Sequence, residues 1–400
     1  MRCHWLLLGA VLLLGAIDVT SSYNVWKLAR ANGNFAFCLY SKVIEGAAGE
    51  NVFFSPFSIS TALSMTYAGA RGNTADEMCQ VLGFCPLTFN VHATFQALLG
   101  SLNSPQATYK LALANGMFVD VKFNMFQSFT NLLMERYSAG YKLLDFNNDA
   151  AGSADYINKW VEDRTNGKIT DLLDAGQVFK SDLVLVNTIY FKGDWKCQFT
   201  STQDATFYLS STDTTKVKMM LQTAPFRYAV NDNLQCQILE LPYDGCRVSM
   251  YILLPLETEG LASLESKLTF NSVTAALANL KKRWLSVGIP KFGIDQYIDE
   301  LIPILRSMGI NLAFEMGSAD FGDISSIPSL YVKDVVHKAF INVDETGTEA
   351  AAATAVTFTH GHHPPVSAQF LADHPFVFLI RDKTTGSILF IGRYVSPPDL

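Results

Sequence analysis

The sequence has little charge and no long run of lysine or arginine. Charged residues make up 17% of its 400 residues, and the formal net charge at pH 7 is −7. Nucleic-acid binding depends on clustered cations, so we expect no nucleic-acid partner. Hydrophobic residues make up 49% of the chain, which excludes a disordered protein and is enough for a large core.

The sequence also lacks the motifs of common catalytic and cofactor sites. It has no glycine-rich phosphate loop, no Cys-x-x-Cys pair, no His-Glu-x-x-His helix and no Gly-x-Ser-x-Gly elbow. We therefore expect neither enzymatic activity nor a cofactor. His360, His362 and His363 are close together, and imidazole suits zinc or copper. Because no acid or thiol accompanies them, we predict exposed loop histidines and no metal site.

Long hydrophobic runs are absent except near the N-terminus. Arg2 and His4 precede an apolar run at residues 6–17, which is too short to span a bilayer comfortably and is typical of a secretory signal. We predict a signal peptide at residues 1–22, cleaved between Ala16 and Tyr23, with an uncleaved anchor as the alternative. The mature protein is then expected to be soluble, secreted and extracellular, with no membrane contact. No Asn-x-Ser/Thr sequence occurs, so N-glycosylation is not expected.

Cysteine is scarce, with seven residues of which Cys3 lies in the predicted signal. The even number that remains permits disulfides in a secreted chain. Cys79 and Cys85 are close enough to be the first pair to test, whereas Cys236 and Cys246 flank a turn without lying opposite one another. A core of this size does not need disulfides, so free buried thiols are equally compatible with the sequence.

Hydrophobic periodicity predicts a chain of mixed helices and strands with no internal repeat or linker. Helices are expected at residues 23–44, from Pro56 through Tyr67, from an Asn73 or Thr74 cap to Gly83, and at 91–102, 155–163, 261–280 and 301–308. Strands are expected just before Ser55 and at residues 109–119, 141–146, 183–191, 226–230, 235–241, 248–254, 285–292, 332–343 and 376–380. The continuous apolar run at 183–191 is typical of a strand buried on both faces.

Residues 344–365 have the pattern of a loop that could become a strand. Within residues 348–359, one face at a period of two has only small, hydroxylic or apolar side chains, and the single charge, Glu349, falls on the other face. The far end has two prolines and three histidines, which is typical of an exposed loop. Four consecutive alanines leave a short helix as the alternative.

The sequence after this stretch resembles a known family. Residues 370–380 resemble the C-terminal signature of the serpins, residues 345–353 resemble their reactive-loop hinge, and residues 69–78 also match the family pattern. The resemblance covers residues 35–395. It implies an α+β serpin fold, in which residues 23–400 form a single domain with three β-sheets, eight to nine helices and an exposed reactive-centre loop at about residues 345–370.

The resemblance further implies a monomeric, metastable inhibitor of serine endopeptidases, whose cleaved loop inserts into a large sheet. It places Trp195 at the breach, where the loop first enters the sheet. It places the shutter, a polar cluster that controls sheet opening, at Ser55, Ser58, Asn187 and His337. The implied hinge consists of Glu345, Gly347, Thr348, Glu349, Ala350, Ala351, Ala352, Ala353 and Thr354.

Three functions remain open on the sequence. The first is a secreted protease inhibitor, the second a non-inhibitory carrier, chaperone or storage protein, and the third a cross-class inhibitor of papain-like cysteine proteases, which also form acyl intermediates. The small residues of the hinge favour inhibition, because bulky or charged side chains would obstruct insertion. The predicted helix at 91–102 has no Lys or Arg, whereas heparin-binding serpins have a basic helix there, so heparin is not an expected partner.

Two family spacings place the cleaved bond differently. Counting forward from Gly347 gives Gly361, and counting back from residues 373–376 gives His362. Phe358 would suit a chymotrypsin-like protease but would leave a shorter loop to insert. We predict cleavage between Gly361 and His362.

Overall fold

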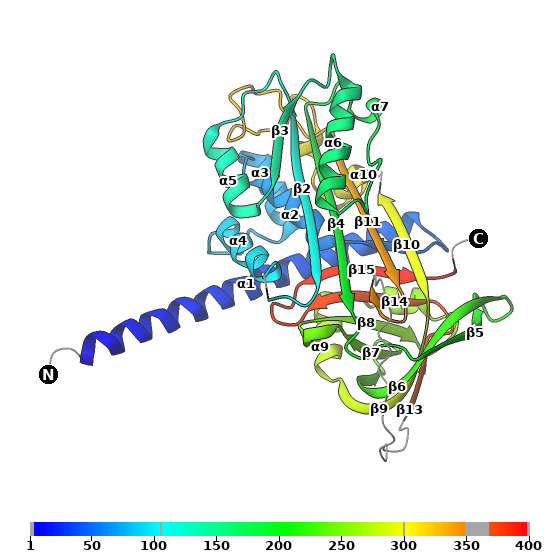
Figure 1. Ribbon diagram of the computed structural model, residues 1–400. Helices are drawn as coiled ribbons and strands as arrows, with labels where there is room; N and C mark the ends of the chain where they lie inside the picture. Colours follow the sequence, from blue (N-terminus) through cyan, green and yellow to red (C-terminus); the bar gives the residue numbers. More distant parts are fainter. Residues whose placement is uncertain (1–3, 105, 299–300, 349–367, 398–400) are drawn as a thin grey trace.

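The computed structural model describes residues 4–104, 106–298, 301–348 and 368–397. Two twisted sheets pack together, with helices around and between them (Figure 1). This α+β arrangement confirms the predicted fold class. The described residues include ten α-helices, two 3-10 helices and fifteen strands, so the expected number of eight to nine helices was too low.

The six-stranded sheet contains the predicted loop entry. Its order is β10 (Phe292–Ile298), β11 (Asp334–Val343), β12 (Gly347–Thr348), β4 (Leu183–Asp194), β2 (Lys110–Asp120) and β3 (Gly140–Leu144). The apolar run of β4 is buried along its whole length from residue 183 to 191. The main core lies on one face of β4, and a smaller cluster that includes residues of α6 (Ala150–Arg164) covers the other.

The nine-stranded sheet combines the second and third sheets that were expected. The 18 residues of β6 (Thr214–Asn231) pair with β5 (Ser201–Tyr208) at one end and with β7 (Cys236–Pro242) at the other, which joins the two parts. The remaining strands are β1 (Val52–Phe54), β15 (Ile388–Tyr394), β14 (Phe376–Asp382), β8 (Val248–Pro255), β9 (Lys281–Pro290) and β13 (Ala368–Leu371).

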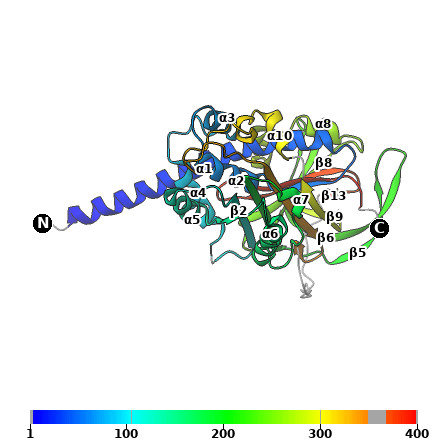
Figure 2. The same ribbon diagram turned by 90° about the horizontal axis from the view of Figure 1, so that it is seen from above.

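The helices begin with α1 (His4–Gly46), whose N-terminal part extends well beyond the rest of the molecule in both views (Figures 1 and 2). No helix within the described ranges is both long enough and apolar enough to cross a membrane. The other helical segments are α2 (Pro56–Tyr67), α3 (Gly72–Leu82), α4 (Val91–Leu102), α5 (Gln127–Tyr137), α7 (Ala175–Val178), η1 (Asp244–Cys246), α8 (Leu261–Glu265), α9 (Phe270–Ala278), α10 (Leu301–Met308) and η2 (Leu312–Phe314).

Two sequence expectations about helices were wrong in detail. The segment at 261–280 is two helices rather than one, because Thr269 caps α9 by accepting a hydrogen bond from the Ser272 amide at 3.0 Å. Neither Asn73 nor Thr74 caps α3, since the helix begins at Gly72. The Thr74 hydroxyl instead accepts from the Asp320 amide. The predicted entry of α2 is confirmed, with the Ser55 hydroxyl accepting from the Ser58 amide and Pro56 in the first turn.

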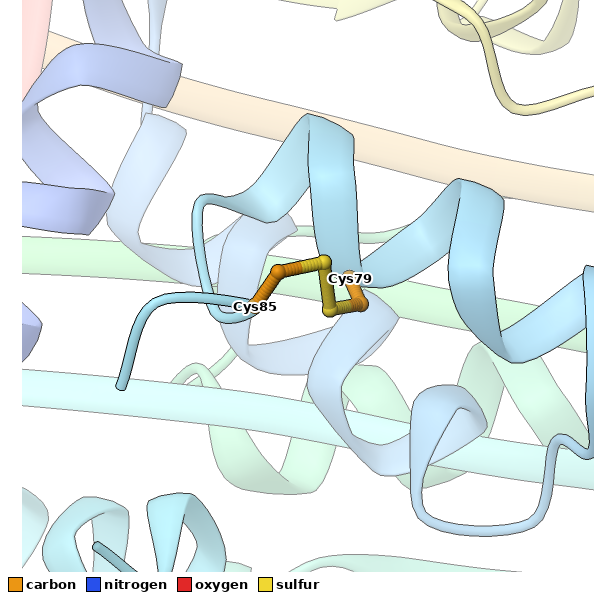
Figure 3. Close-up of a disulfide and its surroundings, with 2 residues drawn as sticks. All are labelled: Cys79 and Cys85. Atoms are coloured by element: carbon orange, nitrogen blue, oxygen red, sulfur yellow. A yellow bond between two sulfur atoms is a disulfide. The ribbon is translucent and has the colours of Figure 1, made fainter. Parts of the chain in front are cut away.

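A disulfide joins Cys79 of α3 to Cys85 just beyond the end of that helix (Figure 3). The sequence had left open whether these two cysteines form a disulfide or remain free thiols, and the structure shows the disulfide. The remaining cysteines of the described chain, Cys38, Cys197, Cys236 and Cys246, have free thiols.

The last two strands, β14 and β15, lie inside the larger sheet. β14 pairs with β8 and β15, and β15 pairs also with β1. Arg393 of β15 is almost completely buried and forms an ion pair with Glu265 at 3.2 Å. Glu265 also accepts a hydrogen bond from the Tyr40 hydroxyl at 2.7 Å, and the Arg393 Nε donates to the Glu50 carbonyl at 3.0 Å. The C-terminal strand is therefore held to α8 and to the loop after α1 by largely buried bonds.

Candidate functional site

The candidate site is a short opening between β4 and β11. Over most of their length the two strands pair directly in parallel, from Asp334 opposite Val184 to Phe340 opposite Tyr190. At one end β12 separates them, pairing with β11 through Thr348 and with β4 through Gly347 and Thr348. The chain leaving β11 has thus already turned back and placed two residues in the sheet.

A tight turn at residues 344–347 produces this reversal. One Asp344 carboxylate oxygen accepts from the amides of Thr346 and Gly347 at 2.9 and 3.2 Å and from the Thr346 hydroxyl at 2.7 Å. A Cβ atom on Gly347 would lie 2.2 Å from the Gly193 carbonyl oxygen. Only glycine fits there, because the two backbones approach too closely for any side chain.

Glu345 holds the outer side of the same turn. Its carboxylate accepts from the Thr202 hydroxyl at 2.6 Å and forms an ion pair with Lys291 at 3.0 Å. Partial burial raises the pKa of Glu345, but the bonds to Thr202 and Lys291 outweigh it, so the pKa lies below its ordinary value. The carboxylate therefore stays ionised at neutral pH and fixes the start of the hinge to the neighbouring sheet.

Thr348 points into the molecule and is completely buried. Its hydroxyl lies 2.7 Å from the Tyr243 hydroxyl, so a local partner satisfies it. Tyr243 stacks on Trp195, with ring centroids 4.5 Å apart and an interplanar angle of 16°. The Trp195 indole nitrogen donates to the Asp344 carbonyl at 2.9 Å. Burial raises the pKa of Tyr243, so its phenol remains protonated and able to donate.

We define Thr348, Tyr243 and Trp195 as the hinge contact. The resemblance had named Trp195 among the site residues, whereas Tyr243 was missed by the sequence analysis. The only signal was its position in the turn before β8, and nothing in that turn indicates that the ring reaches a strand 105 residues away.

The predicted shutter residues lie together under the middle of the β4–β11 pair. His337 is directly opposite Asn187 in the parallel register. The Ser55 amide donates to His337 Nε2 at 3.1 Å. Because Nε2 is therefore an acceptor, the proton of the neutral ring is on Nδ1, which donates to the Asn187 side-chain oxygen at 2.8 Å.

The network continues from Asn187 into its surroundings. Its Nδ2 donates to the Ser58 carbonyl at 2.8 Å and also to the side-chain oxygen of Asn115. Asn115 faces Asn187 across β2 and β4. The sequence analysis missed Asn115, although a polar residue in the interior of a predicted strand was an available signal. Separating β11 from β4 would break the bond between His337 and Asn187 and leave buried polar groups without that partner, which is costly.

The burial of His337 predicts a specific dependence of stability on pH. Burial lowers the pKa of His337 to about 3, whereas an exposed histidine has a pKa near 6.5. As pH falls below about 6.5, the unfolded or opened chain binds a proton that the closed form does not. Stability is therefore lost between pH 6.5 and 3, by about 2 kcal/mol at pH 5. We expect the urea midpoint to fall between pH 7.5 and 5.

The matched variants are His337→Asn and His92→Gln. Burial also lowers the pKa of His92, to about 4, so the two residues act in the same direction. Each substitution should remove about half of the pH dependence between pH 6.5 and 5, and His337→Asn should also form polymers on mild heating. An unchanged slope in His337→Asn would contradict the proposed role of this ring.

Several predicted site residues lie outside the described part of the chain. These are Glu349, Ala350, Ala351, Ala352, Ala353 and Thr354 of the hinge, the proposed bond between Gly361 and His362, and the neighbouring His360 and His363. Among the residues that the structure describes, no group of three or more His, Cys, Asp or Glu side chains could hold a metal ion.

Comparison with known proteins identifies the family. Residues 30–397 match the serpin (serine protease inhibitor) family. The chain is 39% identical over 380 residues to the leukocyte elastase inhibitor of Equus caballus and 38% identical to that of Homo sapiens, and each alignment covers 93% of this chain and 100% of the relative. Serpin B6 of Macaca fascicularis is 40% identical over 377 residues, which are 92% of this chain and 99% of the relative.

Solved structures agree with these matches. Uncleaved ovalbumin is 32% identical with a TM-score of 0.85, and the alignment covers 92% of this chain and 100% of ovalbumin. A complex of human thyroxine-binding globulin is 31% identical with a TM-score of 0.84, over 94% of this chain and 100% of the globulin. The chain belongs to the serpin family.

Proposed function

We propose that this protein inhibits serine endopeptidases by trapping them during cleavage of its own loop. The observation that supports this most directly is β12, which lies between β4 and β11 at the point where a longer inserted strand would begin. The residues after Thr348 on the same predicted face are Ala350, Ala352 and Thr354. Their small side chains suit a crowded sheet interior.

In the proposed mechanism the protease supplies the catalytic serine, and the inhibitor supplies no catalytic residue. The protease attacks the bond between Gly361 and His362 and forms an acyl-enzyme with the Gly361 carbonyl. The loop then enters between β4 and β11 and carries the acylated protease with it. Entry must break the direct pairing of residues 334–340 with residues 184–190, so the polar cluster of His337 and Asn187 controls how easily the sheet opens.

We also propose that the protein is secreted as a monomer after removal of residues 1–22. The family match begins only at residue 30, and the relatives are covered completely by 93% of this chain. The described residues of the proposed signal, from His4 onward, belong to α1, whose N-terminal part extends beyond the rest of the molecule (Figure 1). The disulfide between Cys79 and Cys85 suits an oxidising compartment.

The direct test is incubation with a panel of proteases that starts with a leukocyte elastase, because similar proteins are named as inhibitors of it. We expect a complex that survives SDS and contains the large fragment bound to the protease. Mass spectrometry of the denatured mixture should show a C-terminal fragment beginning at His362. A fragment beginning elsewhere would correct the proposed bond without affecting the mechanism.

A carrier function is the second candidate, because a thyroxine-binding globulin with bound thyroxine shares this fold. The same experiment separates the two functions. Cleavage of the loop by every protease tested, without any SDS-stable complex, would favour the carrier. Complexes with a papain-like enzyme alone would indicate the cross-class inhibitor.

A further inference from the structure

Cys246 lies beside a lysine at the edge of the hinge contact. The Lys196 ammonium approaches the Cys246 sulfur to 2.9 Å. Lys196 is exposed and Cys246 is half-buried, so small molecules can reach the pair. The hydrogen bond to Cys246 raises the pKa of Lys196, which keeps the lysine cationic. Cysteine reacts through its thiolate, and at Cys246 a cation lies against the sulfur.

The other three free thiols of the described chain do not combine accessibility with a contacting ammonium group. Cys236 is completely buried, and burial raises its pKa to about 12. Burial also raises the pKa of Cys197. Cys38 is exposed, but no cation is hydrogen-bonded to its sulfur in the described structure. Cys246 is thus the one accessible thiol of the four with an ammonium group against it.

The turn that contains Cys246 also positions Tyr243. The Cys246 amide donates to the Tyr243 carbonyl at 2.9 Å, and the Tyr243 amide donates to the Val248 carbonyl at 3.0 Å. Cys246 has a backbone φ of 60°, a conformation that non-glycine residues adopt at a cost. The turn is therefore a closed and strained loop. Its first residue is Tyr243, whose phenol belongs to the hinge contact.

A second connection runs through Lys196. Its amide donates to the Pro242 carbonyl at 2.9 Å, and its neighbour Trp195 forms a β-bridge with Tyr243. The backbone of residues 195–196 and that of residues 242–243 are thus joined, and the contact between Lys196 and Cys246 joins the same two segments through side chains. The contact at the Cys246 sulfur therefore joins the same two segments that carry Trp195 and Tyr243, the rings next to Thr348.

We propose that Cys246 is a redox modification site, at which a hydroperoxide oxidises the thiolate to a sulfenic acid and so weakens the hinge contact. The thiolate sulfur attacks the distal peroxide oxygen, a sulfur–oxygen bond forms and the oxygen–oxygen bond breaks. Sulfur gives up two electrons, and the peroxide is reduced to an alkoxide or hydroxide. The Lys196 ammonium is placed to donate the proton that converts this leaving group to an alcohol or water.

Oxidation replaces the sulfur that contacts the Lys196 ammonium with a larger sulfenic acid group. The strained turn then loses the side-chain bond that ties it to residue 196. We expect Tyr243 to shift, and Thr348 to leave the sheet more readily. This inference concerns the hinge in the intact chain and does not depend on which protease, if any, the protein inhibits.

The first test is sulfenic acid labelling of the full-length protein with dimedone during exposure to hydrogen peroxide, followed by peptide mass spectrometry. Cys246 should be labelled several times faster than Cys38, the exposed thiol without a cation, because only Cys246 has an ammonium group placed to protonate the departing peroxide oxygen. Equal labelling of the two would overturn the proposal.

Variants of Lys196 separate the charge from the packing. Lys196→Met should abolish the advantage of Cys246 over Cys38, whereas Lys196→Arg should keep most of it. Amide hydrogen exchange at residues 346–348 should become several times faster after peroxide treatment of the wild type but not of Cys246→Ser. Rapid labelling without any change in exchange would refute the link to the hinge, and an unaffected Lys196→Met would refute the role of the ammonium.

Discussion

Cleavage of the loop between Gly361 and His362 is expected to raise the thermal unfolding midpoint by about 20 °C. The stretch from Thr348 to Gly361 would become a full strand between β4 and β11, replacing one parallel ladder with two antiparallel ones. Each inserted residue gains about one backbone hydrogen bond, with a net contribution of about 1 kcal/mol. Unfolding entropy for a chain of this size is about 0.8 kcal/mol per degree, so a gain of about 15 kcal/mol produces a shift of this order.

The measurement compares intact and cleaved protein by calorimetry at one scan rate, since unfolding of such a chain can be irreversible. Cleavage in the loop between Ser210 and Asp213 is the control, because that exposed turn adds no residue to the sheet. Equal thermal unfolding midpoints for intact and loop-cleaved protein would show that the cleaved loop does not insert into the sheet. That result would exclude the inhibitory mechanism.

Thr348→Arg is expected to convert the protein from an inhibitor into a substrate. Thr348 is completely buried beside Tyr243, and an unpaired guanidinium there would cost several kcal/mol. An increase of about 3 kcal/mol in the barrier slows insertion about 100-fold. Hydrolysis of the acyl-enzyme then precedes trapping, so the variant should be cleaved and release active protease. The measurement is the ratio of SDS-stable complex to cleaved inhibitor.

Two controls accompany this variant. Thr348→Ser keeps the hydroxyl that bonds to Tyr243 and should form complexes like the wild type. Glu349→Arg changes the predicted outward face, in the part of the chain outside the described residues, and should retain most of the trapping. Complexes from Thr348→Arg would show that the predicted inward face is wrong. An absence of complexes from all variants and from the wild type would favour a carrier.

Local patterns predicted the elements that form the walls of the site. The continuous apolar run of β4 indicated a strand covered on both faces, and it is buried as expected. Ser55 and Pro56 indicated the start of α2. The strand β5 was missed because its first four residues, 201–204, are polar and exposed, so no hydrophobic alternation marks it. It forms only because β6 offers a long edge to pair with.

The contacts within the site depend on distant pairing that local patterns do not contain. Asn115 meets Asn187 because β2 and β4 pair in one register, across 72 residues of sequence. Tyr243 reaches Thr348 because the turn before β8 packs over the end of β4. The family resemblance indicated which residues to examine, but only the assembled sheet shows that the hinge has already entered it by two residues.

The position of β14 and β15 within the larger sheet determines what a protease can physically release. Both strands follow the proposed cleavage point, and Arg393 is tied to Glu265 and Glu50 in the protein interior. Cleavage therefore produces two polypeptides that remain non-covalently associated in one folded molecule. The short polypeptide should co-elute with the long one in gel filtration and separate only in denaturant. Its release from the native protein would require the larger sheet itself to come apart.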